Sequence, residues 1–222
     1  DHLEETVATD RPLGGNPFAG ITSVFESRFL AGIAAASIIA SLLGTAVYMV
    51  RAQLVADNIT GVDDQTAFFA MINNWQNLIA MLGQLLLVKH VVSRFGIGTA
   101  LSLLPIVSVA GFAILALDPT LLVVAWLDIV RRGIGFIFGK PSTDMLYSVV
   151  TPEQKYKAKN FIDTTIYRGG DLIGTWLIRA LWALGASGIA LVMLPFAIVW
   201  ALIALWLGRD YRRRAKLGTG SE

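Results

Sequence analysis

Long apolar stretches separated by short polar ones dominate this chain and predict a set of membrane-crossing helices. The clearest is the uncharged stretch of 22 residues from Phe29 to Val50, which lies between Arg28 and Arg51. A helix needs about 20 mainly apolar residues to cross the hydrocarbon core of a bilayer. The same pattern predicts six spans in all, at about residues 29–50, 66–88, 97–117, 120–150, 163–184 and 189–207.

Prolines and glycines indicate where these helices begin, bend and end. Thr151 and Pro152 offer an N-cap and a first helical position, so we expect a new helix to begin there. Pro141 has no amide donor and predicts a kink in the fourth span, whereas Pro105 is tolerated within the third. Residues 185–188, Gly-Ala-Ser-Gly, predict a turn before the last span.

The connections between spans alternate in charge, and this alternation predicts their orientation. Three connections are basic and would share one side of the membrane; their residues are Lys89, His90, Arg94, Lys155, Lys157, Lys159, Arg209, Arg212, Arg213, Arg214 and Lys216. The positive-inside rule then places both termini in the cytoplasm. We therefore expect a cytoplasmic linker over residues 1–27, a six-helix bundle over 28–208 and a basic tail over 209–222.

Composition agrees with an integral membrane protein and argues against an enzyme. Hydrophobic residues make up 55% and charged residues 15% of the 222 positions, whereas soluble domains carry about 25% charged residues. Mean hydropathy is +0.63. Cysteine is absent, the two histidines His2 and His90 are far apart, and no zinc or nucleophile motif occurs, so we expect neither metal nor cofactor. The basic residues lie in short stretches between apolar ones, so nucleic acid is not an expected partner.

Charged and polar residues within the predicted spans are the candidates for a functional site, because ionisable groups are costly at membrane depth. In the fourth span these are Asp128, Arg131, Arg132, Lys140 and Asp144. In the fifth span, side chains at steps of three or four form one stripe: Thr164, Arg168, Asp171, Thr175 and Arg179. Similar stripes in the second and first spans could line a common cavity with it; they are Asn73, Asn77 and Gln84, and Ser37, Ser41, Thr45 and Tyr48.

Structural roles are the competing interpretation for several of these groups. Hydroxyls and amides join helices or bond their own backbone, a span-end arginine such as Arg179 can snorkel, and charges three residues apart can neutralise each other. Asp128 is not expected to satisfy both Arg131 and Arg132, because adjacent side chains face directions about 100° apart. The surplus positive charge needs a substrate anion, another carboxylate or a lipid phosphate.

Small residues at four-residue spacing predict close approach between helices. Gly135 with Gly139 and Gly170 with Gly174 form such pairs within the fourth and fifth spans. We interpret them as packing positions.

Three charged segments carry a resemblance to a known family: residues 140–147, KYKAKNFID at 155–163, and YRGGD at 167–171. They resemble the branch of the major facilitator superfamily that includes ATP/ADP translocase-like nucleotide exchangers. A weaker match extends from about Gly14 to the C-terminus and corresponds to the second half of such a transporter. After Lys-Pro the family often has a small residue followed by Arg-Glu, and here Thr143 takes the place of that arginine.

The resemblance implies an all-α membrane fold in which six helices form one half of a twelve-helix transporter with alternating access. It implies an antiporter of the bacterial inner membrane whose partners are the missing N-terminal half and membrane lipids. The family's charged motif positions correspond here to Lys140, Lys155, Lys157, Arg168 and Asp171.

The sequence therefore supports two hypotheses of different class. In the first, the chain is the C-terminal half of a secondary transporter for a small organic anion, with nucleotides among the candidates. Ten residues are then expected to bind the substrate: Asp128, Arg131, Arg132, Lys140, Asp144, Arg168, Asp171, Arg179, Asn73 and Asn77. In the second, the chain is a membrane scaffold whose charges lock helices together and whose basic segments bind anionic lipid or a cytosolic protein. We expect a fragment, because Asp1 begins a linker-like segment.

Overall fold

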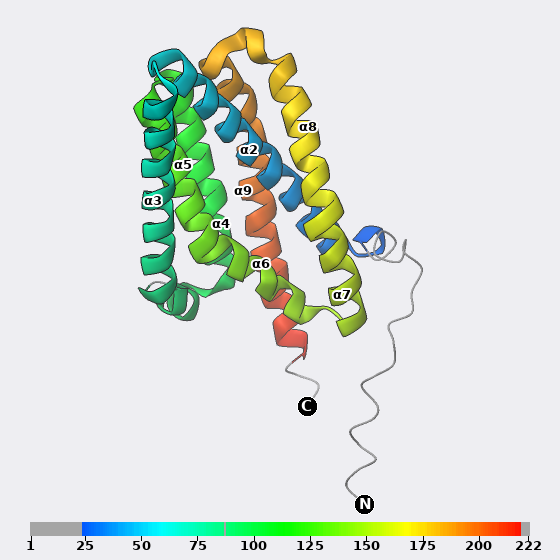
Figure 1. Ribbon diagram of the computed structural model, residues 1–222. Coiled ribbons are helices and arrows are strands. Elements are labelled where there is room, and N and C mark those ends of the chain that lie inside the picture. The colour runs from blue at the N-terminus through cyan, green and yellow to red at the C-terminus, as the bar shows by residue number, and fades with distance from the viewer. Residues whose placement is uncertain (1–23, 87, 219–222) are drawn as a thin grey trace, which may run out of the picture.

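The computed structural model describes residues 24–86 and 88–218, and this part of the chain is a bundle of helices (Figure 1). Three helices are single runs: α2 (Arg28–Asn58), α3 (Val62–Leu86) and α9 (Gly185–Gly218). A fourth, α4 (Val88–Leu117), is kinked at Gly96, whose φ of 77° and ψ of 166° are not helical. Two are compound. The first joins α5 (Leu121–Ile134), η1 (Gly135–Gly139), α6 (Lys140–Leu146) and η2 (Tyr147–Val149); the second joins α7 (Pro152–Phe161), η3 (Ile162–Ile166) and α8 (Tyr167–Ala180).

Three stretches of the described chain are long and apolar enough to cross a membrane: Arg28–Asn58, Gly96–Leu117 and Trp182–Leu217. They coincide with the predicted first, third and sixth spans. The predicted second, fourth and fifth spans coincide with α3, α5–α6 and α7–α8, which are interrupted by polar or charged residues. The result is an all-helical membrane protein with three candidate spans among the described residues, where the sequence predicted six.

Proline chemistry accounts for the start of one compound helix and the irregularity of the other. Thr151 Oγ1 accepts a hydrogen bond from the Gln154 amide at 3.3 Å, and Pro152 is the first residue of α7, as predicted. Pro141 has no amide to donate to the carbonyl four residues earlier. The π-helical η1 occupies this place, so the predicted kink takes the form of a wider helical turn within a continuous helix.

The predicted turn at residues 185–188 is wrong, because α9 already includes these residues. The chain reverses earlier, at the short 3₁₀ helix η4 (Trp182–Leu184). Gly185 then takes a φ of 66°, a left-handed conformation that glycine adopts without steric cost. At the other end of the helix, the basic segment that was expected to form a separate tail continues α9 to Gly218.

Close helix contacts occur where glycine removes the Cβ atom. The most extensive interface joins α4 to α9, and a Cβ added to Gly98 would lie 3.2 Å from the Gly208 Cα. The next joins α2 to α8, where a Cβ on Gly170 would lie 2.9 Å from the Ser41 Cβ. The predicted packing role of Gly170 is therefore confirmed. Between these interfaces, apolar side chains of α2, α4 and α9 form the main core.

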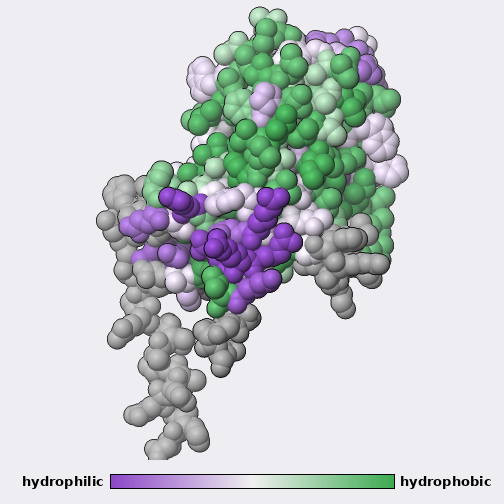
Figure 2. Space-filling view, turned by 180° about the vertical axis from the view of Figure 1, so that it is seen from behind, coloured by the Kyte–Doolittle hydropathy of each residue, from purple (hydrophilic) through white to green (hydrophobic). Residues whose placement is uncertain are grey.

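The two ends of the bundle differ in charge. The starts of α2 and α7 and the end of α9 lie together (Figure 1), and we call this the basic end. Its cations include Arg28, Arg209, Arg212 and Arg213, all exposed. Figure 2 shows a hydrophilic patch at this end and a broad apolar surface over the rest of that face. Most of the predicted linker, at residues 1–23, lies outside the described residues.

Candidate functional site

A cavity of about 450 Å³ lies between α2, α4, the α5–α6 helix, η3–α8 and α9. Apolar residues of α2, α4 and α9 form most of its wall, including Ile33, Ala40, Leu101, Leu104 and Leu207. Four charged side chains also line it: Arg131, Arg132, Lys140 and Asp163. Three cations and one carboxylate give the lining a formal charge of +2, so the cavity favours an anion.

Arg131 is the cavity cation that has no carboxylate partner among the described residues. Its Nη2 donates to the Ala40 carbonyl at 2.8 Å, and its guanidinium lies 6.0 Å from the centre of the Trp200 ring. Among the described residues no carboxylate forms an ion pair with Arg131, and its buried Nε has no hydrogen-bond partner. A buried guanidinium is stabilised by hydrogen-bonded oxyanions, so Arg131 can bind the oxyanion of a ligand.

Arg132 contacts a buried cluster of polar side chains that joins α5 to α2 and α3. Its Nε lies 3.7 Å from one carboxylate oxygen of Asp128, whose other oxygen pairs with Arg51 and accepts from Gln76 Nε2 at 2.7 Å. Asp128 is 3% exposed and Arg51 is 4% exposed. The Arg51 guanidinium also lies 5.1 Å from the Phe69 ring centre. The cluster joins α2, α3 and α5 and reaches the cavity only through Arg132.

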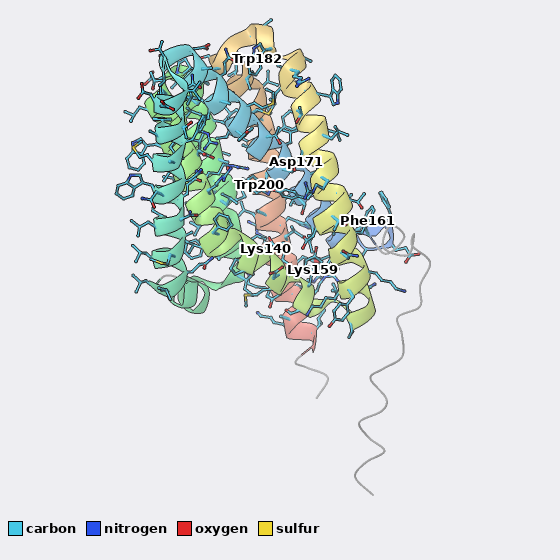
Figure 3. All side chains as sticks on the ribbon, in the orientation of Figure 1. Lys140, Lys159, Phe161, Asp171, Trp182 and Trp200 are labelled. Atoms are coloured by element: carbon cyan, nitrogen blue, oxygen red, sulfur yellow. The ribbon has the colours of Figure 1, made fainter. Side chains whose placement is uncertain are left out.

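Lys140 belongs to a second charge network, which joins α6 to α7 and η3. Its Nζ lies 3.1 Å from Asp163 Oδ2 and 3.8 Å from Asp144 Oδ1. Asp144 also pairs with Lys159, at 2.8 Å. Figure 3 shows Lys140 and Lys159 closer to the basic end than Trp200, so the cavity has a Lys140 end and an Arg131–Trp200 end.

The stripe predicted on the fifth span divides between two surfaces. Asp171 Oδ1 accepts hydrogen bonds from Ser41 Oγ at 2.5 Å and Thr45 Oγ1 at 3.2 Å, so Asp171 faces α2. Arg168 and Arg179 are exposed and have no ion-pair partner among the described residues. The mutual neutralisation considered for the charges of this span is therefore absent.

The cavity brings together fewer of the candidate residues than expected. Of the three predicted polar stripes only Ser37 lines it, and a common cavity lined by all three stays a prediction. Arg131, Arg132 and Lys140 lie in its wall. The other candidates lie outside it, and their role in binding stays a prediction: Asp128, Asp144, Arg168, Asp171, Arg179, Asn73 and Asn77.

Sequence reasoning missed Arg51 and the importance of Gln76. Arg51 was used only to mark the end of an apolar run, yet α2 continues to Asn58 and places Arg51 inside the helix. On α3 the aligned Asn73 and Asn77 are exposed, and the buried amide is Gln76. The residues after Arg51 are compatible with a helix, and this signal could have placed Arg51 inside the helix and not at its end.

Thr143, compared in the sequence analysis with an arginine position of the resembled family, lines the cavity. An arginine in its place would add a fourth cation to the wall. With threonine at this position the wall holds three cations.

Comparison with known proteins adds one partial relationship. No protein-family model and no solved structure matches the chain. Over 94 residues, 40% of this chain, the sequence is 32% identical to ADP,ATP carrier protein 2 of Chlamydia pneumoniae. Part of this chain is similar to an ADP,ATP carrier. The matched stretch covers 17% of that carrier's length.

This similarity agrees with the resemblance on which a transport role was predicted. The relative is named a carrier and not an enzyme, which agrees at that level with the prediction that this chain is not an enzyme. The apolar helices and this similarity together indicate an integral membrane protein. The similarity also points, distantly, to a transport role. Membership of the major facilitator superfamily stays a prediction.

Proposed function

We propose that this chain is part of a secondary transporter that exchanges organic anions, with nucleotides as the first candidates. The observation that carries the proposal is Arg131, a cation without a carboxylate partner among the described residues, in the wall of a cavity with surplus positive charge. The partial similarity to an ADP,ATP carrier supports nucleotides as the first class to test.

The remaining charges of the cavity support an exchange of partners on binding. Arg132 and Lys140 each have a carboxylate within 4 Å, Asp128 at 3.7 Å and Asp163 at 3.1 Å respectively. An anion that binds Arg131 would then compete with these carboxylates for the two neighbouring cations. Because the cations keep an oxyanion partner in both states, the cost of holding charge at membrane depth stays low.

The aromatic and apolar wall gives the cavity a surface for the uncharged part of such a substrate. Trp200 is 6% exposed and lies beside Arg131, and Tyr167 and Phe136 line the cavity while remaining partly exposed. A planar base could stack on an aromatic ring while its phosphate binds Arg131.

The same proposal includes the six-span arrangement of one major facilitator half. Its support is the six helical stretches of the described chain and the gathering of cations at the basic end, which the positive-inside rule would place in the cytoplasm. The N-terminal half of the transporter would then cover the exposed rim of the cavity and supply its other wall.

Counterflow in proteoliposomes tests this function. The intact protein is reconstituted into vesicles loaded with ADP, and uptake of labelled ATP is compared with uptake into empty vesicles. The proposal predicts uptake that depends on internal ADP and is abolished by Arg131→Gln but not by Arg213→Gln, which alters an exposed cation outside the cavity. Absence of uptake, with binding of the protein to anionic vesicles or a cytosolic partner, would favour the scaffold hypothesis.

A further inference from the structure

The Lys140–Asp163 pair is the only ion pair of the described residues in which both side chains line the cavity. The two residues come from different compound helices, Lys140 from the start of α6 and Asp163 from the π-helical η3. Their side chains are 60% and 37% exposed. Asp163 therefore lies within reach of the lysine that a second anionic group of a substrate would use.

The pair is weak enough to be displaced by a ligand. Exposed ion pairs contribute little, because water competes for both groups and two side chains must be held in one geometry. Lys140 keeps a second, longer contact with Asp144 at 3.8 Å, but Asp144 is shared with Lys159 at 2.8 Å. A dianionic group is a stronger partner for Lys140 than a single carboxylate of this kind.

We propose that Asp163 is a built-in competitor that selects for substrates with at least two negative charges. Asp163 neutralises Lys140 while the cavity is empty. It is displaced when a second anionic group of the substrate binds Lys140. A monoanion uses its charge at Arg131 and leaves the Lys140–Asp163 pair intact. This inference rests on the proposed function, because it assumes that the cavity is the anion site.

Two probes with the same base separate charge from shape. Adenosine diphosphate carries two phosphate groups and at least two negative charges near pH 7, whereas cyclic 3′,5′-adenosine monophosphate carries a single negative charge on a phosphodiester. Their dissociation constants are measured with the intact protein in detergent or nanodiscs at one ionic strength. The wild-type protein is expected to bind the diphosphate at least several-fold more tightly than the cyclic probe.

Two isosteric or near-isosteric variants then distinguish competition from a structural role. Lys140→Gln is expected to weaken binding of the diphosphate about tenfold and to leave binding of the cyclic probe nearly unchanged. Asp163→Asn is expected to tighten binding of the cyclic probe by about two- to fivefold, because Lys140 becomes free for it. Arg214→Gln is the control, since Arg214 pairs with Asp210 but does not line the cavity, and both constants should stay unchanged.

The test depends on two effects of opposite direction: Lys140→Gln weakens binding of one probe, whereas Asp163→Asn tightens binding of the other. If the pair only holds α6 against η3, both variants remove the same contact and shift binding in the same direction, and the inference is overturned. Equal affinity of the wild-type protein for both probes also overturns it. Failure of the wild-type protein to bind either probe or ATP contradicts the proposed function itself and is recognisable as a different result.

Discussion

Removing the carboxylate of Asp128 should destabilise the protein more than removing the arginine that pairs with it. Asp128 contacts Arg51, Gln76 at 2.7 Å and Arg132 at 3.7 Å, so Asp128→Ala leaves a buried guanidinium and a buried amide without their partner. Breaking a buried pair in this way costs about 3–5 kcal/mol, because the remaining charge stays out of water. Arg51→Gln leaves Asp128 with two partners, and we expect a loss of about 1–3 kcal/mol.

The free energy of unfolding, measured by denaturant titration in mixed micelles with tryptophan fluorescence, compares these variants. Asp171→Asn is a matched control, because the described partners of Asp171 Oδ1 are the hydroxyls of Ser41 and Thr45, and no cation is left unpaired. Its loss should be about 1 kcal/mol. An Arg51→Gln loss equal to or larger than that of Asp128→Ala would refute the reasoning, as would an Asp171→Asn loss as large as either.

Three further predictions concern packing, charge and capping. Gly170→Ala places a Cβ 2.9 Å from a serine Cβ of α2 and should cost about 1–3 kcal/mol of unfolding free energy, whereas Gly169→Ala, with nothing within 4 Å, should be neutral or stabilising. Thr143→Arg adds a cation to the cavity wall and should tighten ATP binding severalfold, with a steeper loss of affinity on adding salt in the same titration. Thr151→Ala removes the N-cap of α7 and should lower the unfolding free energy by about 1 kcal/mol; Thr66→Ala, which alters a hydroxyl bonded to its own helix, should have little effect.

The course of the helices could be predicted from local sequence, because it depends on the length of apolar runs and on proline and threonine chemistry. The beginnings of α2 at Arg28 and of α7 at Pro152 follow from these signals alone. Gly185 shows the limit of the approach. A glycine-rich run indicates a turn, but the residue that adopts the left-handed conformation depends on how η4 packs.

The site could be predicted only where one helix determines it. Arg131 and Arg132 emerged as a surplus of charge on a single span, and both line the cavity. The partner of Lys140 illustrates what local spacing misses. A spacing of four residues indicates Asp144, yet Asp163, 23 residues away, is closer at 3.1 Å than Asp144 at 3.8 Å.

The buried cluster around Asp128 could not be predicted either, because its members come from different helices. Periodicity groups Asn73 with Asn77 on one face of α3 but does not say which face meets α5. The choice of Gln76 depends on Asp128 and Arg51, which come from two other helices.

Binding of ATP to the Arg131→Gln protein tests the central claim most directly. At fixed ionic strength we predict a dissociation constant about ten- to a hundredfold above that of the wild-type protein, because a charge-assisted hydrogen bond contributes about 1.5–3 kcal/mol. The control Arg213→Gln removes an exposed arginine of the basic end, outside the cavity, and should bind ATP as the wild type does. Unchanged binding by Arg131→Gln, or an equal loss in both variants, would contradict the assignment of Arg131 as the anion-binding residue.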